Sequence, residues 1–146
     1  MKTWTKVLII ALVFGLPAFL LGPVIWTPHP DVHPTNVQKP FFILLSLIEA
    51  LVFGLGIAFI YYGWSLVQKA NPKMKGKAMA FYMSVSWLLV SWWPHDNSHI
   101  HNGLNPMGLL VIDYVFHLTL IITSLIIAYN FFHIFKEYSQ RTTKQK

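Results

Sequence analysis

The chain has 146 residues, enough for one domain, and 55% of them are hydrophobic while only 11% are charged. A soluble domain carries about 25% charged residues, so this composition excludes an ordinary soluble protein and indicates an integral membrane protein. The chain has no cysteine, which excludes disulfides, iron–sulfur clusters, thiolate metal ligands and c-type haem attachment. Its net charge of +6 comes from cations that flank apolar segments, so we expect a lipid bilayer, and no nucleic acid, as partner.

The first half of the chain predicts two membrane-spanning helices. The first covers about residues 5–26. Its apolar run is too long for a signal-peptide core and no small-residue cleavage site follows, so we expect a retained helix. The second covers about residues 41–67, which is long enough to cross about 30 Å of hydrocarbon. Ala50, Gly54 and Ala58 recur along it every four residues, which predicts a face where another helix packs closely.

The second half predicts two more spans, at about residues 78–93 and 107–135, followed by a basic tail at 136–146. The third helix is short for a span, because about 16 helical residues reach only about 24 Å. We expect it to end at the Trp92-Trp93-Pro94 sequence, since proline lacks the backbone donor that continues a helix. The residues that follow, as far as Gly103, are then predicted to form a loop.

The distribution of cations predicts the orientation. Basic residues gather before the first helix, in the 68–77 turn and in the tail, whereas Lys39 alone falls on the opposite side. This asymmetry places both termini in the cytoplasm. The predicted fold is a single all-α membrane domain over residues 1–146, a four-transmembrane-helix up-down bundle in a cell membrane. We also expect either self-association or other membrane subunits as partners.

Histidines and carboxylates concentrate in the outer half of this predicted bundle. The chain has seven histidines, and only His133 falls near the cytoplasmic edge. The others lie in the two outer loops or in the outer half of the fourth helix, where Asp113 precedes His117 by one helical turn. Glu49 lies at a similar depth on the second helix and should face a polar partner, with His117 preferred. The pattern predicts one polar site at the outer face.

Imidazole and carboxylate without thiolate suit Cu(II), Zn(II) or non-haem iron. We predict His95, His99 and His117 as the core ligands of a transition metal, with copper favoured over zinc or iron. A helical turn would put His95 and His99 on one side, whereas an extended segment would pair His99 with His101. Asp113 is expected to orient His117 from behind, and Glu49 to act as a further partner or proton relay. The residues that might complete the metal sphere are His101, His29, His33 and Asp96.

Several functions fit this pattern. The first is a redox or metal-handling protein, or a subunit of a larger membrane oxidoreductase complex. A second is a structural or assembly subunit whose polar residues only cap helices and satisfy backbone groups. A third is a b-type haem protein, which needs axial histidines that face each other across the bundle. The sequence names neither a catalytic residue nor a reaction, and a metal-free proton pathway would use the same residues.

Overall fold

The computed structural model describes residues 2–70 and 75–143, with side chains as far as residue 136. The helices are α1 (Thr3–Ile25), α2 (Lys39–Ala70), α3 (Lys75–Asn102), α4 (Pro106–Ile112), the π-helix η1 (Asp113–His117) and α5 (Leu118–Thr143). Within the described ranges there is no strand, so the predicted all-helical fold is confirmed. Residues 144–146 of the predicted tail lie outside the described residues.

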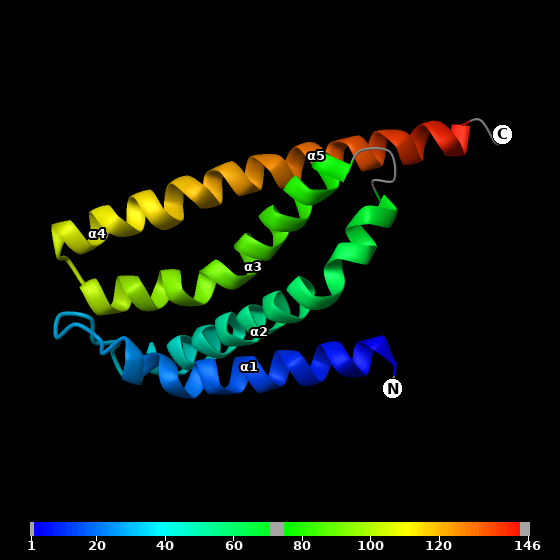
Figure 1. The fold of residues 1–146 in the computed structure, drawn as a ribbon. Helices are drawn as coiled ribbons and strands as arrows, with labels where there is room; N and C mark the ends of the chain where they lie inside the picture. The colour runs from blue at the N-terminus through cyan, green and yellow to red at the C-terminus, as the bar shows by residue number, and fades with distance from the viewer. Residues whose placement is uncertain (1, 71–74, 144–146) are drawn as a thin grey trace.

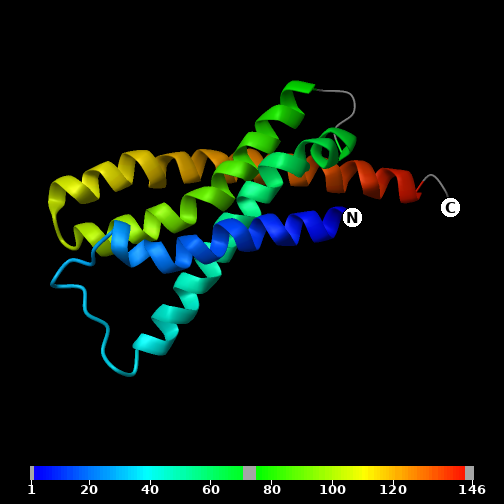
Figure 2. The same cartoon turned by 60° about the horizontal axis from the view of Figure 1, so that its bottom comes forward.

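The helices lie side by side, and α4, η1 and α5 form one continuous rod (Figure 1). α1 begins at the end of the molecule where α5 ends, and the 26–38 segment and the α3–α4 turn lie together at the other end. Figure 2 shows that α2 crosses α1 obliquely. The loop-bearing end, called the loop end below, is also where most histidines gather.

Three helical segments among the described residues are long and apolar enough to cross a membrane: Thr3–Ile25, Lys39–Ala70 and Pro106–Lys136. These confirm a membrane-type protein. α3 does not reach the same apolarity, so length and composition support three of the four predicted spans. Only 18 residues of α3 lie between Lys77 and Asp96, and three serines, Pro94 and His95 are among them, which lowers the hydropathy of this stretch.

The predicted end of the third helix is also wrong, because α3 continues through Pro94 to Asn102. Polar side chains in this stretch bond to carbonyls one turn back: Asn97 Nδ2 donates to the Trp93 oxygen at 2.7 Å, and Asn102 Nδ2 to the Ser98 oxygen at 2.8 Å. These bonds support the helical backbone beyond the proline. The helix stops at Gly103, whose φ of 55° is the left-handed conformation that glycine adopts without strain.

The predicted close-packing face of α2 is confirmed, and its partner is α1. A Cβ atom at Gly54 would overlap the backbone oxygen of Ala11, and one at Gly15 would lie 2.9 Å from the Ala50 oxygen. α1 therefore presents its own small residues to those of α2. This contact fixes how α1 and α2 lie against each other, and α3 packs on the other side of α2.

Candidate metal centre

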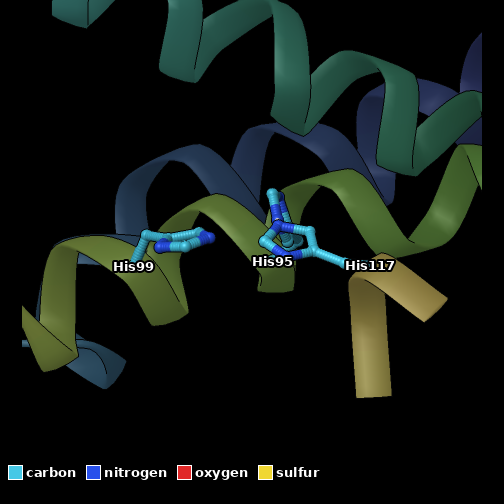
Figure 3. A group of neighbouring side chains, drawn as sticks. All are labelled: His95, His99 and His117. Atoms are coloured by element: carbon cyan, nitrogen blue, oxygen red, sulfur yellow. The ribbon is translucent and has the colours of Figure 1, made fainter. Parts of the chain in front are cut away.

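Three histidines from two helices meet at the loop end of the molecule. One ring nitrogen from each of His95, His99 and His117 lies within 4.8 Å of the other two. The ring centroids are 4.7 Å apart for His95 and His99, 5.0 Å for His95 and His117, and 5.5 Å for His99 and His117. Figure 3 shows the His99 ring pointing toward the other two. The three rings predicted as core ligands are thus brought together.

The helical extension of α3 explains how two of these rings converge. Residues four apart lie on one face of a helix, so His95 and His99 project toward the same neighbour. The extended alternative, which would have paired His99 with His101, is not adopted.

The third ring comes from the π-helical turn η1. The backbone N–H of Leu118 donates to the carbonyl of Asp113, five residues back, so this turn is wider than an α-helical one. His117 is the last residue of that turn and faces α3, where its Nε2 lies 3.0 Å from Nε2 of His95. A local change in helix type therefore lies at the point where the fourth predicted helix contributes its histidine.

A carboxylate lies behind each of two rings. Asp96 Oδ1 is 2.6 Å from Nδ1 of His95, and Asp113 Oδ1 is 2.7 Å from Nδ1 of His117. The second contact is the one predicted from the spacing of Asp113 and His117. An ionised carboxylate only accepts hydrogen bonds, so each Nδ1 must carry the proton and donate it. Nε2 of each neutral ring then keeps its lone pair.

The two Nε2 atoms face each other at 3.0 Å, so in the neutral forms of both rings their lone pairs would point at each other. Two acceptors at hydrogen-bond distance repel unless a proton or a cation lies between them. His95 is buried, whereas the side chain of His117 is 43% exposed, so the pair is sheltered on one side and open on the other. The geometry is that of a site that attracts positive charge.

His99 lies beyond the apolar part of α3, and its environment favours the neutral ring. Burial lowers the pKa of His99, and the neighbouring His95 and His117 rings lower it further. A neutral imidazole is the form that binds metal. In their neutral forms all three rings can offer a lone pair, and the carboxylates behind His95 and His117 direct that lone pair to Nε2.

Glu49 is buried on α2, and it lines a cavity of about 260 Å³ together with Asp96 and His99. Among the described residues no hydrogen bond joins it to His117, the preferred partner, whose ring contacts Asp113 and His95 instead. Glu49 therefore lies on the side of the centre where Asp96 holds the His95 ring.

The remaining predicted ligands lie outside the group of three. Asp96 holds His95 from behind. His101 Nδ1 donates to the carbonyl of Thr27 at 2.9 Å, and the backbone N–H of His29 donates to the carbonyl of Ile100 at 2.9 Å. The His29 ring lies against Gly103, and His33 lines an open cavity of about 360 Å³ beside His99. His101 and His29 therefore fasten the 26–34 segment to the end of α3.

Aromatic packing around His95 had not been predicted. The rings of Trp92 and Phe116 lie edge-on to the His95 ring, with centroids 5.8 and 5.5 Å away. The spacing of Phe116, one residue before His117, could have indicated this contact.

No model of a known protein family, no curated protein and no solved structure matches this chain.

Proposed function

We propose that this protein is a membrane metalloprotein in which His95, His99 and His117 hold a transition-metal ion at the loop end. The observation that carries the proposal is the approach of two Nε2 atoms to 3.0 Å, with a third imidazole beside them. A cation between these nitrogens removes their repulsion. Histidine ligands that donate their other ring N–H to a carboxylate are typical of metal sites, and two of these three do so.

Copper is the favoured ion, because imidazole sites bind Cu(II) most tightly among the common divalent metals, with zinc next. Three protein ligands leave a coordination position for water or a substrate. His99 also borders two cavities, of about 260 and 360 Å³, through which such a ligand can approach. These features support a redox or metal-handling role, either alone or as a subunit of a larger membrane enzyme.

A b-type haem fits the spacing less well. Two nitrogens 3.0 Å apart and each about 2.0 Å from one ion subtend about 95° at that ion, which is a cis arrangement. The two axial ligands of a haem are trans, so their nitrogens lie about 4 Å apart on opposite sides of the ring. The distance between His95 and His117 thus favours a small ion.

In the structural-subunit alternative, the same three histidines hold the helices together without a metal. If one of the two facing rings is protonated, its Nε2–H donates to the other, and the triad is a hydrogen-bonded brace between α3 and the α4–α5 rod. A brace contains no metal whereas a metal site does, so metal analysis distinguishes the two.

The test is elemental analysis of protein purified in detergent without added metal, with the His99→Ala variant alongside. We expect one equivalent of metal in the wild-type protein and its loss in His99→Ala, with helical content unchanged. His133→Ala is the matched control, because His133 lies on α5 against Tyr129 and away from the triad. Metal-free wild-type protein that also fails to bind added Cu(II) or Zn(II) would establish the structural brace instead.

We also propose that α3 crosses the membrane with the three more apolar segments, with the loop end outside and both ends of the chain in the cytoplasm. The asymmetric distribution of cations supports this orientation. Cysteines replacing Thr35 or Leu104 should react with an impermeant thiol reagent added to intact cells, and one replacing Lys69 should not. Labelling at Lys69 alone would reverse the orientation.

A further inference from the structure

A second cavity lies at the loop end, apart from the histidines. It has a volume of about 370 Å³ and lies between the end of α1, the 26–34 segment, the start of α2 and α3. This volume is within the range of small-molecule sites, which span about 300–1,000 Å³. None of its lining residues belongs to the histidine triad. Any ligand that it holds therefore binds separately from the proposed metal.

The wall of this cavity is mostly apolar. Side chains from three parts of the chain form it, among them Phe19, Leu20, Val32, Phe42 and Ile43. No charged side chain is among its lining residues. A carboxylate or phosphate ligand would thus be desolvated without a cation to pair with, which is costly. The lining selects an uncharged, lipid-soluble molecule.

Two polar atoms of α3 interrupt this apolar wall. Asn97 Oδ1 and Trp93 Nε1 both face Gly22, where a Cβ atom would lie 3.1 Å from the first and 3.5 Å from the second. The Asn97 amide nitrogen donates to the Trp93 carbonyl, so its oxygen is the free end. Among the described residues neither Asn97 Oδ1 nor Trp93 Nε1 has a hydrogen-bond partner. Beside Gly22 the cavity therefore offers one acceptor and one donor, and Ser46 of α2 is a further polar residue in its lining.

The Trp93 indole is fixed by its neighbours, so this donor has a defined position. Its ring lies edge-on to Trp26 at 4.9 Å between centroids and tilted against Phe53 at 4.9 Å. Gly22 has no side chain, which lets both polar atoms lie against α1 at the edge of the cavity. An adjacent acceptor and donor complement a hydroxyl group, which donates one hydrogen bond and accepts another.

We propose that this cavity binds an uncharged, lipid-soluble alcohol whose hydroxyl donates to Asn97 Oδ1 and accepts from Trp93 Nε1–H. Its apolar body occupies the space among Phe19, Leu20, Val32 and Phe42. A hydrocarbon chain of a lipid fills the same space but leaves both polar atoms unpaired, which disfavours it relative to an alcohol.

The test compares two quenchers that differ only in the hydroxyl, 2-bromododecan-1-ol and 2-bromododecane. Bromine quenches tryptophan fluorescence on contact, and Trp26 and Trp93 both line the cavity. Each compound is titrated into wild-type protein in phosphatidylcholine nanodiscs, with a chelator present so that the result does not depend on the metal centre. We expect saturable quenching by the alcohol, and half-saturation at about tenfold higher concentration for the bromoalkane, because two hydrogen bonds are lost.

Two variants locate the site. Asn97→Leu removes the acceptor and should raise the half-saturating alcohol concentration about threefold, toward that of the bromoalkane. Asn36→Leu makes the same change on an exposed loop and should bind as the wild type does. Trp93→Phe removes the donor. In this variant the quenching of Trp26 should also require a higher alcohol concentration for half-saturation. Equal quenching by both compounds would mean that the cavity only accommodates lipid chains, and unsaturable quenching would mean that it is closed; either result overturns the proposal.

Discussion

The α1–α2 pair and the pair formed by α3 with the α4–α5 rod are built on different principles. In the first pair, backbones approach so closely that Gly54 cannot carry a side chain. In the second, contact depends on large side chains and polar bonds, such as that from Trp87 Nε1 to Thr119 Oγ1 at 2.9 Å. In the most apolar 18-residue window of each segment, 22% of the residues are buried in α1 and 28% in α2, against 6% in the α4–α5 rod. The tightly packed pair supports the fold, and the loosely packed pair carries the histidines.

The largest expected effect is on the tightly packed pair. Gly54→Ala puts a methyl group onto the backbone of Ala11, which cannot move aside as a flexible side chain would. We expect a loss of about 1–3 kcal/mol in the free energy of unfolding, measured by denaturant titration in detergent. Gly76→Ala is the matched control, because nothing lies within 4 Å of a Cβ atom there. Equal stability of the two variants would mean that α1 and α2 are not in close contact.

A second substitution tests the chemistry of the loosely packed pair without disturbing its packing. Asp113→Asn keeps the shape of the side chain but removes the charge that holds the His117 tautomer. We expect metal affinity to fall about 10–100-fold, as is usual for partners behind a histidine ligand, with little change in unfolding. Competition with a chromogenic chelator measures this affinity. An unchanged affinity would show that Asp113 has no influence on a bound ion.

The smallest expected effect concerns the contact between α3 and α5 farther from the triad. Trp87→Phe keeps an aromatic ring near Phe116 but removes the hydrogen bond to Thr119. We expect a loss of about 1 kcal/mol in unfolding free energy, the net value of one such bond. Trp4→Phe on the exposed start of α1 should cost nothing measurable. If both variants match the wild type, the bond is not formed in the membrane.

Local spacing predicted much of the candidate site. Residues four apart on a helix meet whatever surrounds them, so the contact between Asp113 and His117 and the shared side of His95 and His99 could be anticipated. The continuation of the helix through Pro94 could not be anticipated. A proline ends a helix or is tolerated within it according to which groups bond to the carbonyl that it leaves free. The sequence offered no local indication of the bonds that continue α3.

Contacts between distant segments were less predictable. Glu49 was expected beside His117 from depth alone, yet depth does not specify rotation about the helix axis, and Glu49 lines a cavity with Asp96. His101 and His29 had the right chemistry for ligands, but the His101 ring bonds to the Thr27 carbonyl and the His29 ring contacts the Asp31 carboxylate. The π-helical turn at Asp113–His117 leaves no periodic trace in the residues themselves.

The one-sided attachment of the α4–α5 rod has a mechanical consequence. His117 is carried by a rod whose outer surface meets only lipid or partner proteins in a membrane, while His95 is fixed in a helix packed on both sides. A helix held along one side tilts to match the thickness of the bilayer. Metal–ligand distances tolerate changes of only about 0.2 Å, so a change in tilt of the rod would alter the geometry at the triad. Bilayer thickness would then be a physical variable that sets how tightly the proposed site holds an ion.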